Sequence, residues 1–367
     1  MSLWVVVGGQ FGGEGKGKIS AFITRQEEID ICIRCGGPNS GHTFVAEDGS
    51  TVLLRQLPTG YIRPQTRLLV PAGALIDLAV LKYELDSLRL DPRRVGVDRN
   101  AMIIEQSDRD RESQLGLRDR LSSTLCGVGS AVARRALRGA DVKLAGQVAH
   151  NATWLAELVT DVSEEANIAL DHGKKVLIEG TQGFGLSLYH TDCYPKATSR
   201  DTTAAGFLSE VGLSPLLVTE IVLVFRTFPI RVSGDEAGPM KDEITWETLR
   251  QESDCPYPIQ EMTTVSKKLR RVGRFDWDLA AKAIRMNRPT KVAVSGLDYL
   301  SFSDRSLSCS EALSSPSRTF LAGFMQHFAM PVSYGGVGPR LSETILVSPA
   351  VTAERTPSEP DRETCIR

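Results

Sequence analysis

Near its N-terminus the chain reads Leu3-Trp4-Val5-Val6-Val7-Gly8-Gly9-Gln10-Phe11-Gly12-Gly13-Glu14-Gly15-Lys16-Gly17-Lys18. The apolar run predicts a buried strand, and the glycines that follow let the backbone approach a ligand closely where a helix begins. Amides at a helix N-terminus and two lysines suit a phosphate group. The spacing resembles the P-loop, but Ile19 stands where that motif has Ser or Thr for magnesium. A tight strand–helix turn without a ligand is the alternative.

A second glycine-rich loop follows another apolar run and reads Gly36-Gly37-Pro38-Asn39-Ser40-Gly41-His42-Thr43. In open α/β sheets, ligands bind beyond the carboxyl ends of the strands. A histidine there is suited to act as an acid near neutral pH. Taken alone, His42 is more simply a hydrogen-bonded surface residue. Its place beside the first loop favours a functional role.

Short β-rich runs alternate with helical patterns, which predicts an α/β fold with a mostly parallel central sheet flanked by helices. Beyond the first strand we expect strands at 29–34, 52–55, 67–70, 101–104, 175–179, 220–226 and 291–294, and helices at 75–88, 153–172 and 277–286. The sequence has no repeat or low-complexity linker, so residues 1–346 are predicted to form a single large domain. Residues 347–367 are polar and aperiodic, which predicts a flexible tail.

Composition excludes several classes of protein. The chain carries 43 basic and 45 acidic residues, a net charge of −2, and 6% aromatic residues, which argues against a nucleic-acid partner. Its sequence lacks the run of roughly 20 apolar residues that spans a bilayer, and its start does not resemble a signal peptide. Seven scattered cysteines, an odd number, are typical of free thiols. We therefore expect a cytoplasmic protein without a membrane partner.

Both loops resemble signature segments of the adenylosuccinate synthetase family, which reads G-Q-W-G-D-E-G-K-G-K and G-G-x-N-A-G-H-T. Similar segments follow in order at 55–60, 179–188, 194–199 and 264–273, the last as a degraded form of T-T-G-R-R-R-R-x-G. The resemblance covers residues 4–346. In its short length and in the motif G-F-G-L-S-L-Y at 183–189, the chain is most similar to the compact archaeal and phage branch of the family.

The resemblance implies a carbon–nitrogen ligase. In this family the γ-phosphate of a nucleoside triphosphate moves to the purine 6-oxygen, and the amine of L-aspartate then displaces it. The developing charge needs cations, and the resemblance implies His42, Lys16, Gly13 and Gln182 at the reacting centre and Mg²⁺ held by Gly13 and Gly41. It implies that the triphosphate is bound by Gly12, Gly13, Glu14, Gly15, Lys16, Gly17, His42, Thr43, Asp298, Gly338 and Pro339.

Further residues match the substrate sites of the family. The nucleoside monophosphate is implied to contact Asn39, Ser123, Thr124, Arg138, Gln182 and Thr198. Arg138 matches an arginine that the partner subunit supplies, so we expect a homodimer; a solvated helix face is the alternative. Thr264, Ser266, Lys268 and Arg270 match a cationic loop that holds the aspartate carboxylates. Lys267 and Leu269 replace a glycine and an arginine of that loop.

The largest departure from the family is at position 13, where Gly13 replaces the aspartate that takes the purine N1 proton. Three interpretations compete. The protein is an inactive nucleotide-binding homologue, or Glu14 or a water replaces the base on inosine monophosphate (IMP), or the substrate differs and needs the space. We favour the third, because guanine carries a 2-amino group at that edge. The same gap occurs in phage relatives that make 2-aminoadenylosuccinate from dGMP for diaminopurine DNA, which would place a phage-encoded protein in the host cytoplasm.

A second departure concerns the phosphate donor. The family reads guanine with T-K-L-D, and this chain has Ser295-Gly296-Leu297-Asp298 instead. The lysine that packs on the base is replaced by Gly296, which weakens guanine selection. ATP or dATP therefore joins GTP as a possible donor, and a surface aspartate ending a strand is the alternative for Asp298. A generic P-loop ATPase or kinase is the rival enzyme class, and Ile19 argues against it.

Overall fold

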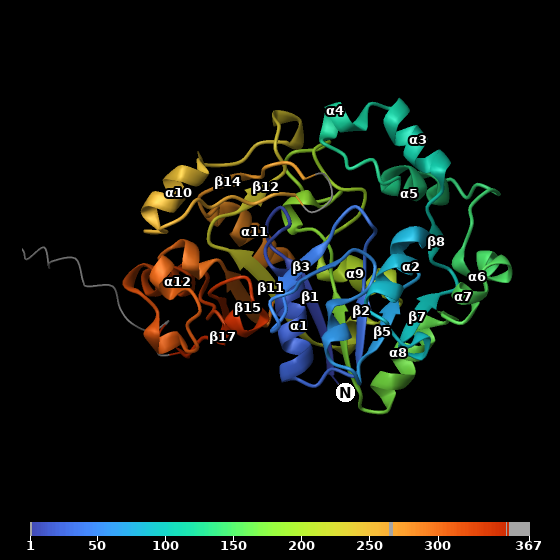
Figure 1. Cartoon of the computed structure of the whole chain (residues 1–367), viewed down its shortest axis with the longest axis horizontal. Coiled ribbons are helices and arrows are strands. Elements are labelled where there is room, and N and C mark those ends of the chain that lie inside the picture. The colour runs from blue at the N-terminus through green and yellow to red at the C-terminus, as the bar shows by residue number, and fades with distance from the viewer. Residues whose placement is uncertain (1, 264–266, 350, 352–367) are drawn as a thin grey trace, which may run out of the picture.

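The computed structural model describes residues 2–263, 267–349 and 351. Over these residues the main sheet has ten strands (Figure 1), and its only antiparallel pair is formed at one edge by residues 334–336 and 344–346. In spatial order the strands are β17 (Thr344–Leu346), β16 (Tyr334–Gly336), β15 (Lys291–Ser295), β11 (Val218–Arg226), β1 (Ser2–Gly8), β10 (Lys175–Glu179), β2 (Ile31–Arg34), β5 (Arg67–Val70), β7 (Val95–Asp98) and β9 (Val159–Thr160). The predicted α/β class with a mostly parallel sheet is confirmed.

Strand β1 is central and buried on both faces, as its unbroken apolar sequence predicts. Leu3, Val5 and Val7 join the larger core, with side chains from α8 (Val162–Asp171), α9 (Ala204–Val211), α11 (Trp277–Asn287) and α12 (Ser315–Phe328). Trp4 and Val6 face α1 (Lys16–Gln26) on the other side. The alternation of strand side chains therefore sorts helices onto both faces of the sheet.

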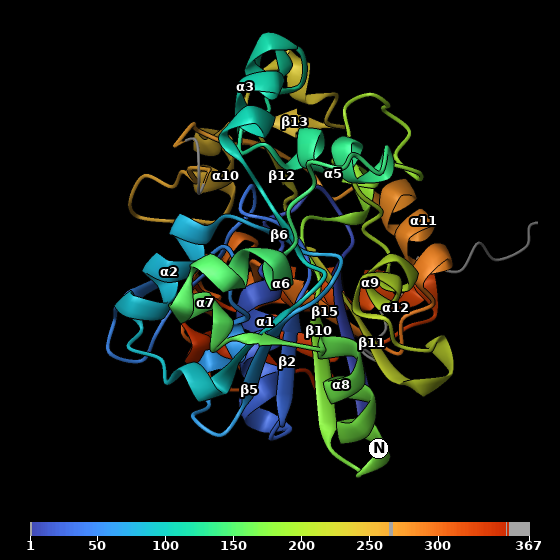
Figure 2. The same ribbon diagram turned by 90° about the vertical axis from the view of Figure 1, so that its right-hand side faces the viewer.

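A cap of smaller elements lies beyond one end of the sheet, at the top of Figures 1 and 2. It includes α3 (Gln106–Gln114), α4 (Leu117–Leu121), α5 (Val128–Ala136), α10 (Trp246–Glu252) and the antiparallel sheet of β12 (Ile230–Arg231), β14 (Arg271–Gly273) and β13 (Glu243–Ile244). The N-terminus lies at the opposite end, so β1 runs toward the cap. The carboxyl ends of the parallel strands thus face these elements.

Two predicted helices are wrong in their extent. The stretch 153–172 contains α7 (Thr153–Ala156), then β9, and only then α8, whose N-cap Asp161 accepts a bond from Glu164 N at 3.0 Å. Strand β9 interrupts the helical pattern because it pairs with β7 at the sheet edge. The stretch 75–88 begins as β6 (Leu75–Ile76), paired with β8 (Met102–Ile103), before α2 (Leu78–Ser87).

The strands predicted at 29–34, 67–70, 175–179, 220–226 and 291–294 are confirmed in the main sheet, whereas 101–104 contributes only the two residues of β8, paired with β6. The stretch 52–55, however, forms β4 (Thr51–Leu54) in a hairpin with β3 (His42–Val45), outside the main sheet. The remaining short helix is α6 (Ala145–Val148). Nearly all of the predicted tail lies outside the described residues. In the part of the chain that the structure describes, none of the helices combines the length and apolar character that crossing a bilayer requires.

Candidate active site

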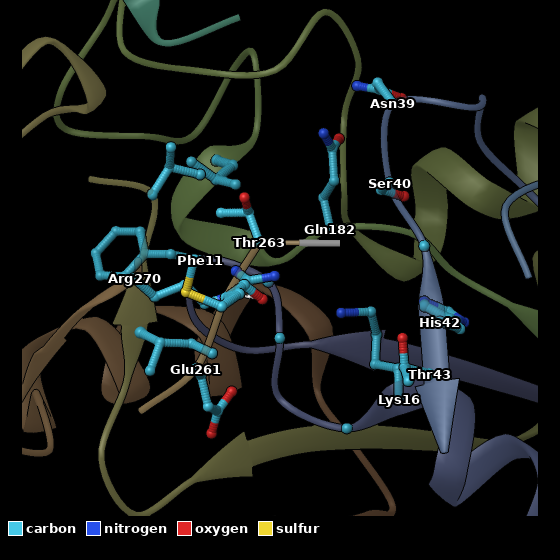
Figure 3. A pocket seen from close by; sticks show the side chains of 18 of the residues that line it. Phe11, Lys16, Asn39, Ser40, His42, Thr43, Gln182, Glu261, Thr263 and Arg270 are labelled. Atoms are coloured by element: carbon cyan, nitrogen blue, oxygen red, sulfur yellow. Dashed lines mark hydrogen bonds between the residues drawn. The ribbon is translucent and has the colours of Figure 1, made fainter. Parts of the chain in front are cut away.

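Loops from the carboxyl ends of β1, β2 and β10 converge on a cavity of about 480 Å³ beneath the cap (Figure 3). Segments 230–232 and 260–263 and Arg270 close its opposite side. The cavity is lined by Phe11, Gly12, Gly13, Gly15, Lys16, Gly17, Asn39, Ser40, Gly41, His42, Thr43, Ser122, Thr124, Gln182, Leu186, Ile230, Val232, Gln260, Glu261, Met262, Thr263 and Arg270. Residues more than 200 positions apart in the sequence therefore share one site.

The glycine-rich loop wraps around a buried carboxylate. Glu14 is fully buried and accepts hydrogen bonds from the amides of Gln10, at 3.1 Å, and Gly12, at 2.8 Å. Its second oxygen accepts from Lys16 Nζ at 2.6 Å. Both carboxylate oxygens are thus used to shape the loop, and Glu14 does not line the cavity. Its side chain does not fit the role of a replacement base.

Lys16 is the cation of the loop that faces the cavity. Its side chain lines the cavity and stands beside Thr43 in Figure 3, and its ammonium group is held by Glu14. Gly17, one position later, lets α1 approach β3, because a Cβ atom there would overlap the Cβ of His42. The close packing of the helix start on the strand places Lys16 and His42 together. A transferable phosphoryl group between them would meet both.

His42 stands in a buried polar network at the start of β3. Its Nδ1 contacts both Arg34 Nη1, at 2.7 Å, and the carboxylate of Glu179, which also accepts from Arg34 Nη1 at 2.9 Å. Because a carboxylate only accepts, the bond to Glu179 requires the tautomer with its proton on Nδ1. The second oxygen of Glu179 accepts from the amide of Thr59, at 2.8 Å, and from its hydroxyl, at 2.6 Å. Glu179 therefore fixes the ring orientation and leaves Nε2 without a partner among the described residues.

The electrostatics of this network keep His42 neutral. Burial, reinforced by the charge of Arg34, lowers the pKa of His42 to about 4. Burial opposes ionisation of Glu179, but the neighbouring His42 and Arg34 hold its pKa below the usual value. An anion next to Nε2 would favour the imidazolium, whose second N–H would then donate to that anion. The acid role predicted for His42 thus depends on a bound anion.

Position 13 opens onto the cavity without a side chain. Gly13 has φ +73°, and its carbonyl accepts from Arg226 Nη1 at 3.1 Å. Arg226 is buried and paired with Glu261, whose oxygens lie 2.6 and 3.2 Å from its two η-nitrogens. The prediction that the missing side chain leaves empty space here is wrong at the Cβ position, because a Cβ atom on Gly13 would lie 2.7 Å from Ile230 Cδ1.

The contacts of Gly13 are relevant to the prediction that Gly13 and Gly41 hold Mg²⁺. In the described ranges no group of three His, Cys, Asp or Glu side chains is placed to hold a metal. The Gly13 carbonyl already accepts from the guanidinium of Arg226, whose charge would repel a cation there, and the metal role of Gly13 stays a prediction. The Gly41 carbonyl belongs to the cavity-lining loop and fits an ion that takes most of its oxygens from nucleotide phosphates. Such an ion would neutralise the phosphate charge that builds up during transfer.

A second buried lysine connects the glycine-rich loop to the residues that are predicted to bind the base of the nucleoside triphosphate. Lys18 Nζ donates to the carbonyls of Gly338, at 2.6 Å, and Glu343, at 3.3 Å. Burial lowers the pKa of Lys18 to about 8, against the opposing charges of Asp298 and Glu343. Asp298 is buried, its pKa is raised by burial, and Arg305 Nη1 lies 3.6 Å from its carboxylate. These residues lie next to the helix start but do not line the cavity.

Of the residues predicted from sequence, one set lies together on the cavity: Gly12, Gly13, Gly15, Lys16, Gly17, Asn39, Gly41, His42, Thr43, Thr124, Gln182 and Arg270. Another set does not line it in this structure: Glu14, Ser123, Arg138, Thr198, Lys268, Asp298, Gly338 and Pro339. Thr264 and Ser266 lie outside the described residues. The binding roles of all of them stay predictions.

Sequence reasoning missed several wall residues. Ile230 and Val232 come from a short apolar stretch without any functional signal. Behind the wall, Arg226 donates to the Gly13 carbonyl, and it ends a strand that reads as core. Glu261 adjoins the cationic loop, and only its nearness to that motif hinted at a role. The part played by Glu179 could have been found, because a carboxylate that ends a buried strand beside Gly180 is unusual for a structural residue.

Comparisons with known proteins agree with this geometry. The family model of adenylosuccinate synthetase matches residues 5–149 and 140–311. The chain is 38% identical to the adenylosuccinate synthetase of Thermococcus onnurineus over 94% of its length and 98% of that protein, and 39% identical to that of Methanocaldococcus jannaschii over 93% and 95%.

Two solved structures share the fold. The fully ligated adenylosuccinate synthetase of Plasmodium falciparum superposes with a TM-score of 0.85 at 20% identity, over 95% of this chain and 100% of that one. The succinoaminodeoxyadenylate synthetase of cyanophage S-2L, bound to dGMP and dATP, gives 0.80 at 27% identity, over 96% and 98%. Sequence and fold together show that this chain belongs to the adenylosuccinate synthetase family of carbon–nitrogen ligases.

Proposed function

We propose that the chain joins L-aspartate to C6 of dGMP, with hydrolysis of a nucleoside triphosphate, to give 2-amino-2′-deoxyadenylosuccinate. The observation that carries the proposal is Gly13, which lines the cavity where the family places a carboxylate. A carboxylate beside the purine N1 and C2 would crowd the 2-amino group of guanine. The solved cyanophage relative with dGMP bound supports the same substrate.

The reaction proceeds in two balanced steps. The 6-oxygen of guanine attacks the γ-phosphorus, the bond to the β-phosphate oxygen breaks, and the N1 proton passes to a water molecule. The aspartate amine then forms a bond to C6, and inorganic phosphate leaves with the 6-oxygen and with one proton from the amine. Lys16 and the neighbouring loop amides bind the phosphates, and His42 Nε2 stabilises the transferred group. Arg270 lines the cavity, and in this proposal its guanidinium binds an aspartate carboxylate.

The donor and the assembly are part of the proposal. Gly296 in place of a base-packing lysine favours an adenine donor, and dATP in the cyanophage relative supports it. Arg138 is exposed at the end of α5 and does not line the cavity of its own chain. We infer that it reaches the monophosphate of a second copy, which would make the active unit a homodimer.

The second candidate is ordinary adenylosuccinate synthesis from IMP. The archaeal relatives named above favour it, since their identity to this chain exceeds that of the cyanophage enzyme. An inactive homologue is disfavoured by the intact network of His42, Glu179 and Arg34, which includes two buried charges. Such a network is costly to keep without a function.

The test is turnover of dGMP, GMP and IMP side by side, each with L-aspartate and with ATP, dATP or GTP. We expect dGMP to give the highest kcat/KM, with an aspartate-dependent release of phosphate and a succinylated 2-aminopurine as product. Omitting aspartate is the control for simple triphosphate hydrolysis. IMP as the best substrate would sink the proposal, and no turnover with any purine would favour the inactive homologue.

A further inference from the structure

The space beside Gly13 is taken by one side chain. A Cβ atom at position 13 would lie 2.7 Å from Ile230 Cδ1 and 3.1 Å from Ile230 Cγ1, whereas Arg270 Nη1 would be 3.6 Å away. Carbon atoms in contact sit roughly 3.5–4.0 Å apart. In this arrangement a side chain at position 13 therefore requires the end of the Ile230 side chain to move. Both residues line the same cavity.

Ile230 is held in place by its neighbours. It is 1% exposed and packs with Phe228, Leu249 and Val272 in a cluster of its own. Its backbone pairs with Val272 across β12 and β14. A side chain packed in this way yields only at the cost of a local rearrangement.

The backbone of Gly13 is equally constrained. Arg226 donates to its carbonyl, and Gln10 brackets the backbone of Arg226 with two hydrogen bonds of 3.0 Å, one from the side-chain amide and one to the side-chain oxygen. Glu261 fixes the guanidinium of Arg226 from the other side. A shift of the loop to relieve a clash with Ile230 would therefore break these contacts.

We propose that Ile230 is a specificity-determining residue, whose side chain takes the place of the missing residue-13 side chain and forms the wall that meets the C2 edge of the purine. This inference rests on the proposed function. The 2-amino group of guanine packs against the end of Ile230, and a purine without that group leaves a gap there. Gly13 and Ile230 act as a pair, so that an aspartate at position 13 also requires a shorter residue at 230.

The steric part is tested by a double-mutant cycle on stability. We expect Gly13→Ala to lower the Tm more than Gly12→Ala does. Gly12 is the matched control, because its φ of +86° imposes the same backbone strain, but the nearest atom to its Cβ would be 3.7 Å away. Ile230→Val removes the atom at 2.7 Å, so it should recover part of the Tm lost in Gly13→Ala. Strictly additive Tm shifts would overturn the pairing.

The specificity part is tested by kinetics with dGMP and IMP. We expect Ile230→Val to lower the ratio of kcat/KM for dGMP to that for IMP by about tenfold, the low end of the effect of one methyl group in a pocket. A purely structural role would lower both values equally and leave the ratio unchanged, which would overturn the proposal. A wild-type preference for IMP would instead refute the proposed function, and the Tm cycle would still report on the pairing.

Discussion

We expect His42→Asn to lower kcat by about 10²–10⁴-fold, the usual loss when a positioned acid is removed. Asparagine retains a polar group that reaches toward Glu179, but it has no counterpart of Nε2, the nitrogen of the cavity wall that has no partner among the residues the structure describes. The KM values should change much less, since Lys16 and the loop amides still bind the phosphates. Steady-state kinetics of phosphate release measure the effect. A kcat within about threefold of the wild type would contradict the role of His42.

The pH dependence of stability provides the control for this variant. The folded-state pKa of His42 is about 4, below the ordinary value of 6.5, so the unfolded chain binds a proton first on acidification. The contribution of this residue to the free energy of unfolding is therefore present above pH 6.5 and is lost as the pH falls toward 4. His42→Asn should be less sensitive over that window. An equal pH sensitivity of the wild type and the variant would mean that groups other than His42 determine the loss of stability in this window.

We expect Glu179→Ala to lower the free energy of unfolding by about 3–5 kcal/mol, because it leaves a buried cation without its counter-charge. Arg34 is 2% exposed and Glu179 is fully buried. The substitution also removes the acceptor for the Thr59 amide and hydroxyl, and it releases the ring of His42. Urea unfolding followed by circular dichroism measures the loss.

Glu165→Ala is the matched control for that prediction. Glu165 also pairs with an arginine, Arg67, at 2.7 Å, but both side chains are more than a quarter exposed. Water screens such a pair, and the expected loss is about 0–1 kcal/mol. Similar losses in the two variants would show that burial of the Glu179 network contributes little.

Much of the fold followed from the sequence because the central strands are buried on both faces. Continuous apolar runs such as β10 and β15 have no other simple explanation, and the glycine loop after β1 predicted the position of the site. The two misjudged helices failed for a physical reason. Strands β6 and β9 are two residues long and exist because of their pairing partners, which no local pattern reveals.

The site was predictable where function requires a particular residue type and not where it requires a shape. His42, Lys16 and Gln182 stand in recognisable motifs and line one cavity. Ile230 fills space next to Gly13, and an isoleucine in an apolar strand looks the same whether it faces the core or a ligand. The sequence placed Glu14 beside the reacting centre as a possible base, whereas its carboxylate is turned into the loop.

The central claim is that this site accepts the purine 2-amino group, and dGMP and dIMP differ by that group alone. The most direct test is therefore the ratio of their kcat/KM values under identical donor and aspartate concentrations. We expect dGMP to be favoured by about tenfold or more, as for a group that fills a fitted pocket. Equal values, or a preference for dIMP, would contradict the claim.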